Sequence, residues 1–137
     1  MEPEIIKGGI HSDDRGVLLY NNDFNASDIK RIYFIENKDT EVARAWQGHK
    51  IEQRWFSVTN GSFLIKTIKI DNWDKPSSDL TCMEFVISSK TLDILYVPKG
   101  YITSIQALEN ESKILAMADY RLGEIQDEFR FETNYFQ

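Results

Sequence analysis

The sequence predicts an all-β sandwich or barrel, and three observations support this fold class. Short runs rich in aromatic and β-branched residues recur along the 137 residues. Segments of turn-forming residues separate these runs. The pair Asn60-Gly61 joins two strand-like runs, in the pattern of a β-hairpin with a type I′ turn. Many short strands with frequent turns are typical of sandwiches and barrels.

Each expected element follows from its local composition. In chain order, strands are expected at residues 30–37, in both arms of a hairpin at 54–70, and at 83–88, 93–98 and 113–120. Asn, Asp, Ser, Pro and Gly predict loops at 21–28, 71–79 and 98–100. For residues 105–112 we expect a strand that ends in a turn, rather than a helical turn. Residues 122–131 are the best candidate for a short helix. No repeat or linker divides the sequence, so a single domain is expected over residues 1–137.

The composition excludes several classes of function. Hydrophobic residues make up 42% and charged residues 28% of the chain, which is typical of a soluble globular protein. The net charge of -6 argues against a nucleic-acid partner, which requires a basic surface. No apolar run approaches the ~20 residues that cross a bilayer, and no secretory signal begins the chain. We therefore expect a cytoplasmic protein with no membrane partner.

Cysteine usage supports the same location. Cys82 is the only cysteine, so the chain forms no internal disulfide, which fits a reducing compartment. No partner motif surrounds Cys82, and we expect it in the core.

One stretch, RAWQGHKIEQRW at residues 44–55, places many functional groups between two tryptophans. If the stretch is extended, Gln47, His49, Ile51 and Gln53 share one face by the period of two, and Glu52 points to the other face. Imidazole titrates near neutrality, so His49 is the candidate base, whereas an amide such as Gln47 does not titrate there.

Several motifs together resemble those of deoxysugar-nucleotide cupins. RAWQGHKIEQ resembles the first cupin motif and YVPKGYITS the second, while DDRG and ADYRLGEIQDEFRF resemble the flanking segments of this family. IKRIYFIEN also resembles the strand that precedes the histidine motif in dTDP-4-keto-6-deoxyhexose 3,4-ketoisomerases. The dTDP-4-dehydrorhamnose 3,5-epimerases are the other similar group. The resemblance covers most of the chain, and it implies a double-stranded β-helix (jelly roll) and a homodimer that exchanges N-terminal strands.

The chain departs from the family pattern at its histidines. The ketoisomerases typically read Arg-Gly-x-His-x-His, and here the matching residues keep the second histidine as His49 and have Gln47 in place of the first. With only His11 and His49 in the chain, no metal site is expected, because metal cupins gather two or three histidines and a carboxylate. No other cofactor is expected.

The resemblance implies a nucleotide-sugar ligand and assigns candidate roles. His49 is the expected base, and Tyr33 the acid if it faces inward. The expected substrate-binding residues are Arg15, Arg31, Arg44, Gln47, Gln53, Lys66, Tyr101 and Thr103. Structural alternatives remain open: a hydrogen-bonded barrel histidine at His49, a solvated lysine at Lys66, and strand aromatics at Tyr33 and Tyr101.

Three functions follow from these residues. The first is an isomerase or epimerase that removes a proton next to the keto group of a nucleotide-linked 4-keto-6-deoxysugar, in glycan or O-antigen precursor synthesis. The second is a non-catalytic cupin that binds a sugar nucleotide and lost its base where Gln47 stands. The third is a metal-free cupin with unrelated small-molecule chemistry.

Overall fold

The computed structural model describes residues 1–136, and almost all of its regular structure is strand. The strands are β1 (Glu4–Ile6), β2 (Gly9–Asp13), β3 (Gly16–Tyr20), β4 (Arg31–Ile35), β5 (Arg44–His49), β6 (Arg54–Asn60), β7 (Ser62–Lys69), β8 (Cys82–Ser88), β9 (Ile94–Val97), β10 (Tyr101–Ala107), β11 (Lys113–Ala118) and β12 (Phe129–Arg130). One 3-10 turn, η1 (Ala26–Asp28), is the only helical segment in that range. No helix within residues 1–136 is long and apolar enough to span a membrane.

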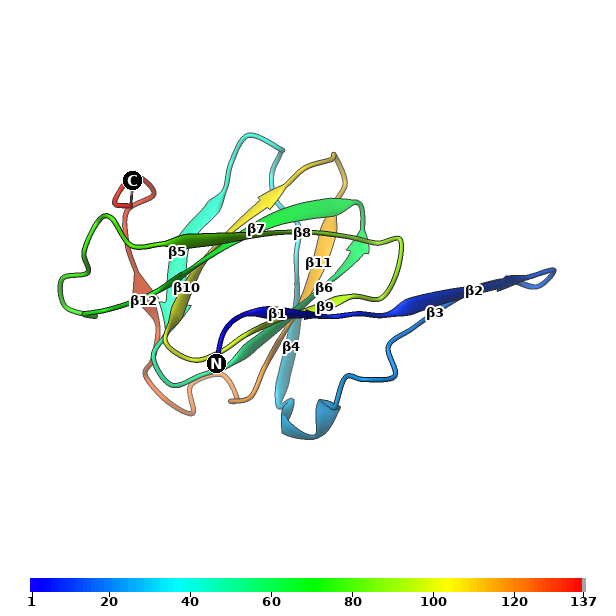
Figure 1. Ribbon diagram of the computed structural model, residues 1–137, viewed down its shortest axis with the longest axis horizontal. Helices are drawn as coiled ribbons and strands as arrows, with labels where there is room; N and C mark the ends of the chain where they lie inside the picture. The colour runs from blue at the N-terminus through cyan, green and yellow to red at the C-terminus, as the bar shows by residue number, and fades with distance from the viewer. Residues whose placement is uncertain (137) are drawn as a thin grey trace.

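Two five-stranded antiparallel sheets form the body. Their strand orders are β1-β9-β6-β11-β4 and β12-β5-β10-β7-β8 (Figure 1). Most neighbours in each sheet are distant in sequence, so the chain alternates between the two layers, as in a jelly roll. The predicted double-stranded β-helix is confirmed, as are the strands expected at 30–37, 54–70, 83–88, 93–98 and 113–120.

The core lies between the two sheets and follows from the alternation of side chains along each strand. In β7, Phe63, Ile65 and Thr67 are buried while the residues between them are half-buried. Phe63 and Ile65 pack with Leu95 and Ile114 from the facing sheet. Each such buried side chain contributes about 1.5–3 kcal/mol to folding. Trp46 and Trp55 are buried as well, in two smaller clusters.

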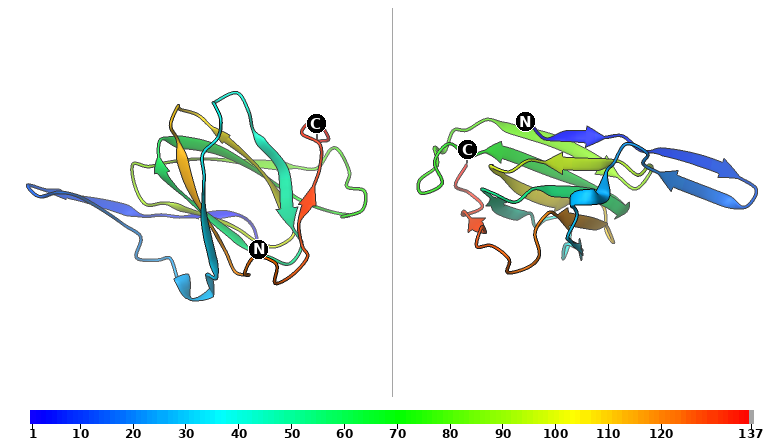
Figure 2. Two further views of the ribbon diagram at one scale, coloured as in Figure 1. Left: turned by 180° about the vertical axis from the view of Figure 1, so that it is seen from behind. Right: turned by 90° about the horizontal axis from the view of Figure 1, so that it is seen from below.

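A β-hairpin made of β2 and β3 extends away from this body (Figures 1 and 2). In the described part of the chain the two strands pair only with each other, and every residue of β3 is exposed. The hairpin nevertheless carries apolar side chains, with Val17 63% and Leu18 61% exposed. β1, by contrast, pairs with β9 of its own chain.

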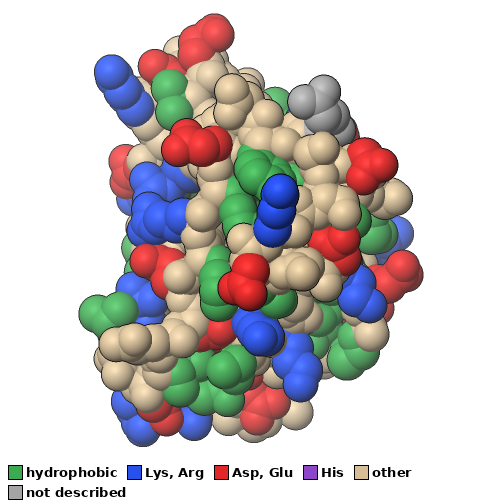
Figure 3. All heavy atoms as spheres, turned by 90° about the vertical axis from the view of Figure 1, so that its left-hand side faces the viewer, with side chains coloured by type: hydrophobic (Ala, Val, Ile, Leu, Met, Phe, Trp, Pro, Cys, Tyr) green, Lys and Arg blue, Asp and Glu red, His purple; other side chains and the backbone are tan. Residues whose placement is uncertain are grey.

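The end of the molecule opposite the hairpin has a surface of mixed charge. Figure 3 shows Lys, Arg, Asp and Glu side chains interspersed there around small hydrophobic areas. No continuous basic face is visible in that view. The hydrophobic cluster of Trp46, Ile68, Ile70 and Ile102 is covered by Trp73, Leu80, Phe131 and Phe136.

Three local predictions are wrong. The segment expected as a helix, 122–131, has no helix; Phe129 and Arg130 pair instead with β5. Cys82 is exposed rather than buried, because Met83, Phe85 and Ile87 take the inward positions of the edge strand β8. The hairpin at Asn60-Gly61 exists, but only Gly61 has a positive φ, of 73°, so its turn is not type I′.

Candidate active site

A cavity of about 440 Å³ opens between the two sheets. β4, β5, β6, β10 and the segment around β12 all contribute to its wall. Its polar lining residues are Arg31, Tyr33, Glu36, Arg44, Gln47, His49, Glu52, Arg54, Tyr101, Thr103, Glu128 and Arg130. Seven of the ten residues that the sequence indicated as a site therefore meet at one cavity: Tyr33, Arg31, Arg44, Gln47, His49, Tyr101 and Thr103.

A tight turn after β5 determines which side chains face this cavity. β5 ends at His49, and the carboxylate of Asp127 accepts the backbone N–H groups of Lys50, Ile51 and Glu52 at 2.9, 2.8 and 2.8 Å. The regular alternation expected through residues 44–55 is therefore broken. Ile51 is exposed, and Glu52 turns toward His49, so the expectation that Glu52 points away is wrong.

The histidine ring is held through one nitrogen. Its Nδ1 lies 2.8 Å from the backbone oxygen of Asp127 and 3.2 Å from Oε2 of Glu52. Two oxygen acceptors at Nδ1 favour the tautomer that carries its proton there. Nε2 then bears the lone pair, and no residue among 1–136 makes a hydrogen bond with it.

Two opposing influences set the protonation state of this ring. Burial is the largest and, together with the positive charge of Arg54, lowers the pKa of His49 below its ordinary value of 6.5. The carboxylate of Glu52 acts in the opposite direction but is outweighed. At neutral pH the ring is therefore uncharged, which is the form that accepts a proton.

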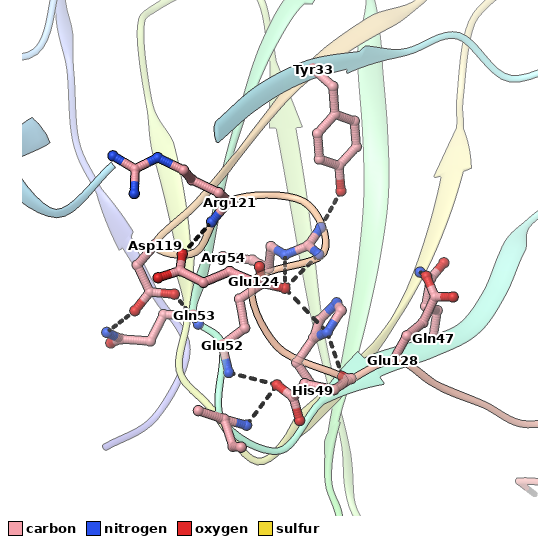
Figure 4. Close-up of polar contacts among 12 residues, drawn as sticks. Tyr33, Gln47, His49, Glu52, Gln53, Arg54, Asp119, Arg121, Glu124 and Glu128 are labelled. Atoms are coloured by element: carbon pink, nitrogen blue, oxygen red, sulfur yellow. Dashed lines mark hydrogen bonds and ion pairs between the residues drawn. The ribbon is translucent and has the colours of Figure 1, made fainter. Parts of the chain in front are cut away.

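Glu52, which lies beside Nδ1 of His49, forms a buried ion pair with Arg54 of the other sheet (Figure 4). Arg54 donates to Oε2 of Glu52 from Nε at 3.1 Å and from Nη2 at 2.7 Å, and both residues are more than 90% buried. Nη1 of Arg54 donates to the hydroxyl oxygen of Tyr33. Since that oxygen accepts a hydrogen bond from the guanidinium, its own O–H remains available as a donor toward the cavity.

Three further guanidinium groups line the cavity, those of Arg31, Arg44 and Arg130. Arg31 lies over the ring of Tyr33, 4.4 Å from its centroid. Neither Arg31 nor Arg44 forms an ion pair with any carboxylate in the described part of the chain. Guanidinium groups without a carboxylate partner are suited to bidentate contacts with phosphate oxygens.

A second cluster of interacting polar side chains lies on the wall formed by β5 and β12. Nε2 of Gln47 donates to Oε1 of Glu128 at 2.6 Å, and Nη2 of Arg130 lies 3.3 Å from the same oxygen. Thr103 pairs with Gln47 across β5 and β10. Burial raises the pKa of Tyr101, so that residue is a neutral phenol at this wall.

Three predicted site residues lie elsewhere. The amide of Gln53 is bonded to Asp119 and Tyr96, outside the cavity, so its expected position on the His49 face is wrong. Lys66 lies opposite Glu84 across β7 and β8, away from the cavity lining. Arg15 is at the end of the β2–β3 hairpin, where it pairs with Asp13 at 2.7 Å.

Sequence reasoning did not predict the ion pair of Glu52 and Arg54, missed Glu128 as a cavity residue, and missed Asp127 as the anchor of the turn beside the cavity. Glu52 and Arg54 are two residues apart, a spacing that places both side chains on the same face of a strand. The sequence did not show that extended structure resumes after the turn. Asp127 and Glu128 were assigned to a helix, and no local signal links them to residues 47–52. Within residues 1–136, no group of three or more His, Cys, Asp or Glu side chains is arranged to hold a metal ion.

Comparison with known proteins gives results at the level of structure only. No family model matches the sequence. No curated protein matches it either.

Solved structures do match. A variant of the 3,4-ketoisomerase QdtA from Thermoanaerobacterium thermosaccharolyticum, in complex with TDP-4-keto-6-deoxyglucose, has a TM-score of 0.73 and 21% identity over 98% of this chain and 91% of that chain. The RmlC epimerase of Mycobacterium tuberculosis has a TM-score of 0.75 and 14% identity over 94% and 68%. The WlaRB TDP-quinovose 3,4-ketoisomerase of Campylobacter jejuni has a TM-score of 0.68 and 18% identity over 97% and 95%.

These identities establish the fold and leave the activity to be argued from the site. The structural neighbours are the two groups that the sequence motifs indicated, so that resemblance is confirmed at the level of fold. The chain has the jelly-roll fold of the dTDP-sugar 3,4-ketoisomerases and the dTDP-4-dehydrorhamnose 3,5-epimerases.

Proposed function

We propose that this protein is an isomerase or epimerase of a nucleotide-linked 4-keto-6-deoxysugar, with His49 as the base. One observation carries the proposal. His49 is buried, its pKa is lowered, its Nδ1 is held by two oxygens, and its Nε2 has no partner within residues 1–136. A histidine of this kind, in a cavity, is more suited to proton transfer than to holding the fold together.

The chemistry requires a base and a donor for the developing enolate. Nε2 of His49 takes the proton from the carbon next to the keto group; the electron pair of that C–H bond forms a C=C bond, and the carbonyl π pair moves to the oxygen. The hydroxyl of Tyr33, whose oxygen accepts a hydrogen bond from Arg54, donates to the carbonyl oxygen. Removal of water from the cavity by the ligand strengthens both interactions.

The nucleotide is the proposed ligand of Arg31 and Arg44. Both guanidinium groups line the cavity without a carboxylate partner in the described chain, so each is free to contact a diphosphate. One structural neighbour was solved with TDP-4-keto-6-deoxyglucose and another with TDP, which supports this ligand class. The place we propose for such a reaction is the synthesis of a glycan precursor in the cytoplasm.

Arg44→Ala tests the ligand assignment. Losing a charge-assisted bidentate contact is expected to weaken dTDP binding by about 10- to 100-fold, measured by titration calorimetry. Lys66→Ala is the matched control, because Lys66 lies outside the cavity, and its affinity is expected to equal that of the parent. Equal affinities in the Arg44→Ala variant and the parent would remove Arg44 as the phosphate anchor.

A non-catalytic sugar-nucleotide binder is the second candidate. The observation that favours it is Gln47, an amide at a position where ketoisomerases carry a histidine. Incubation of the protein with dTDP-4-keto-6-deoxyglucose in deuterated water, followed by NMR, separates the two. Deuterium at a ring carbon supports the enzyme, whereas binding without deuterium incorporation supports the binder.

We also propose a homodimer, on the basis of the β2–β3 hairpin. The hairpin exposes Val17 and Leu18 and has no strand partner within residues 1–136, and covering such apolar strands removes an aggregation-prone surface. Arg15, at the end of this hairpin, lies away from its own cavity, so its predicted role in binding requires the cavity of a second copy. Light scattering at tens of micromolar tests this proposal, and a monomer there would contradict it.

A further inference from the structure

We propose that Glu128 is a second proton-transfer group of the cavity and that it accepts the proton of the sugar hydroxyl next to the keto group. This inference rests on the proposed function and deepens it. A base that also receives the hydroxyl proton allows the keto group itself to move to the neighbouring carbon. The proposed reaction is therefore keto transfer rather than epimerisation.

Among the cavity carboxylates of residues 1–136, Glu128 is the one whose nearest hydrogen-bond donor is a neutral amide. Oε2 of Glu52 is shared between Arg54 and His49. Glu36 lies 3.2 Å from Lys113, whose ammonium group also lies over the exposed Phe34 ring.

Glu128, by contrast, is held mainly by a neutral amide. Nε2 of Gln47 donates to its Oε1 at 2.6 Å, while Arg130 is 3.3 Å from that same oxygen. Its other oxygen, Oε2, accepts no hydrogen bond from any residue in the range 1–136. The amide therefore fixes the carboxylate through one oxygen and leaves the second available to a ligand.

The placement of Glu128 complements the other two proton-transfer groups (Figure 4). Tyr33 projects from β4 in one sheet, and His49 ends β5 in the other. Glu128 directly precedes β12, the strand that pairs with β5, and it lies beside Gln47. A sugar ring bound in the cavity thus meets a donor, a base and a carboxylate on separate parts of the wall.

The proton balance of keto transfer uses all three groups. His49 removes the proton from the hydroxyl-bearing carbon next to the carbonyl, and Tyr33 gives a proton to the carbonyl oxygen, which produces a neutral enediol. Glu128 then takes the proton of the neighbouring hydroxyl as that oxygen becomes the new carbonyl. The other carbon of the enediol, the former carbonyl carbon, then takes the proton that His49 holds. Protonated Glu128 and ionised Tyr33 return to their starting forms by exchange with water.

Epimerisation does not need the third group, because it removes a proton from carbon and returns one to the same carbon. This difference gives the experiment its two readouts. Deuterium incorporation at carbon reports on His49, and appearance of the isomer with the moved keto group reports on Glu128. Both are followed by NMR with dTDP-4-keto-6-deoxyglucose in deuterated water.

Glu128→Gln is expected to lower formation of the keto-transfer product by about 100-fold or more while carbon exchange stays within about threefold of the parent. Glu132→Gln is the matched control, since Glu132 is exposed and outside the cavity, and it is expected to change neither rate. Formate added to Glu128→Ala is expected to restore product formation by about tenfold, which a purely structural role would not allow.

Four results would overturn the inference. Unchanged product formation in Glu128→Gln would show that no hydroxyl proton passes through this carboxylate. Loss of both readouts with dTDP affinity retained would show that carbon deprotonation also depends on it. A parent that exchanges deuterium but forms no product with a moved keto group would keep the proposed function and refute this inference. A parent without exchange would refute both.

Discussion

His49 and Gln53 lie at the two ends of one turn and differ in how their polar atoms are satisfied. The N–H of Gln53 donates to Asp119 at 2.8 Å, its Nε2 donates to the same carboxylate at 2.9 Å, and its Oε1 accepts from Tyr96. Among the described residues 1–136, the ring of His49 has partners at Nδ1 only. Nε2 of His49 is accessible from the cavity and has no protein partner within residues 1–136, so it marks a site for a ligand, whereas the amide of Gln53, bonded at both its nitrogen and its oxygen, marks scaffold.

Both ends of the turn are held by remote acidic residues. Asp127 accepts three backbone N–H groups after His49, from 75 to 77 residues further along the chain. Asp119 accepts the backbone N–H of Gln53 from a separation of 66 residues. The two residues therefore share a well-anchored turn, and they differ in whether a polar side-chain atom is left without a hydrogen-bond partner among residues 1–136.

The largest expected effect is on the cavity side. Arg54→Leu leaves the buried carboxylate of Glu52 without its cation, and such a loss costs about 3–5 kcal/mol of unfolding free energy. Urea unfolding measures it. Arg121→Leu is the control, because Arg121 is exposed and its side chain forms no ion pair in the described chain, and a change below about 0.5 kcal/mol is expected. A similar small change in Arg54→Leu would show that the buried pair does not stabilise the site.

A smaller effect is expected on the scaffold side. Gln53→Ala leaves Tyr96 without its acceptor and one Asp119 oxygen without its donor, at a cost of about 1–3 kcal/mol. Thermal and urea unfolding measure this loss. Affinity for dTDP is expected to equal that of the parent, since Gln53 does not line the cavity. Weaker nucleotide binding at unchanged stability would contradict the division between scaffold and site.

The smallest expected effect is on the pH dependence of stability. Because the pKa of His49 is lowered by burial and then by Arg54, the unfolded chain binds more protons than the native protein below pH 6.5. Stability from this group is complete above its unfolded pKa and falls as the pH decreases through the folded pKa. Urea unfolding of the parent and His49→Asn between pH 8 and 5 checks the sign. A smaller loss toward acid in the parent than in the variant would contradict it.

Much of the fold follows from local sequence. The strands at 54–70 are predicted because Asn60-Gly61 separates two apolar runs, and Gly61 indeed adopts a positive φ. Strand β8 illustrates a missed signal: Met83, Phe85 and Ile87 alternate, which already places Cys82 outward on the chain's exposed edge. Composition alone favoured a buried cysteine, and the period of two was the better guide.

The candidate site is only partly predictable, for a physical reason. His49 follows from its titration range, and Tyr33 from its strand. The break after His49 does not, because Asp127 imposes it from a segment that resembles a helix in isolation. The long-range hydrogen bonds of that carboxylate override the local pattern, and they turn Glu52 inward.

The most direct test of the central claim compares deuterium exchange into dTDP-4-keto-6-deoxyglucose for the parent, His49→Asn and Gln53→Asn, at a temperature where all three are folded. We expect His49→Asn to lower exchange by about 100-fold or more and Gln53→Asn to stay within about threefold of the parent. Exchange that survives in His49→Asn, or that is lost equally in Gln53→Asn, would contradict the claim that the free nitrogen of His49 is the base.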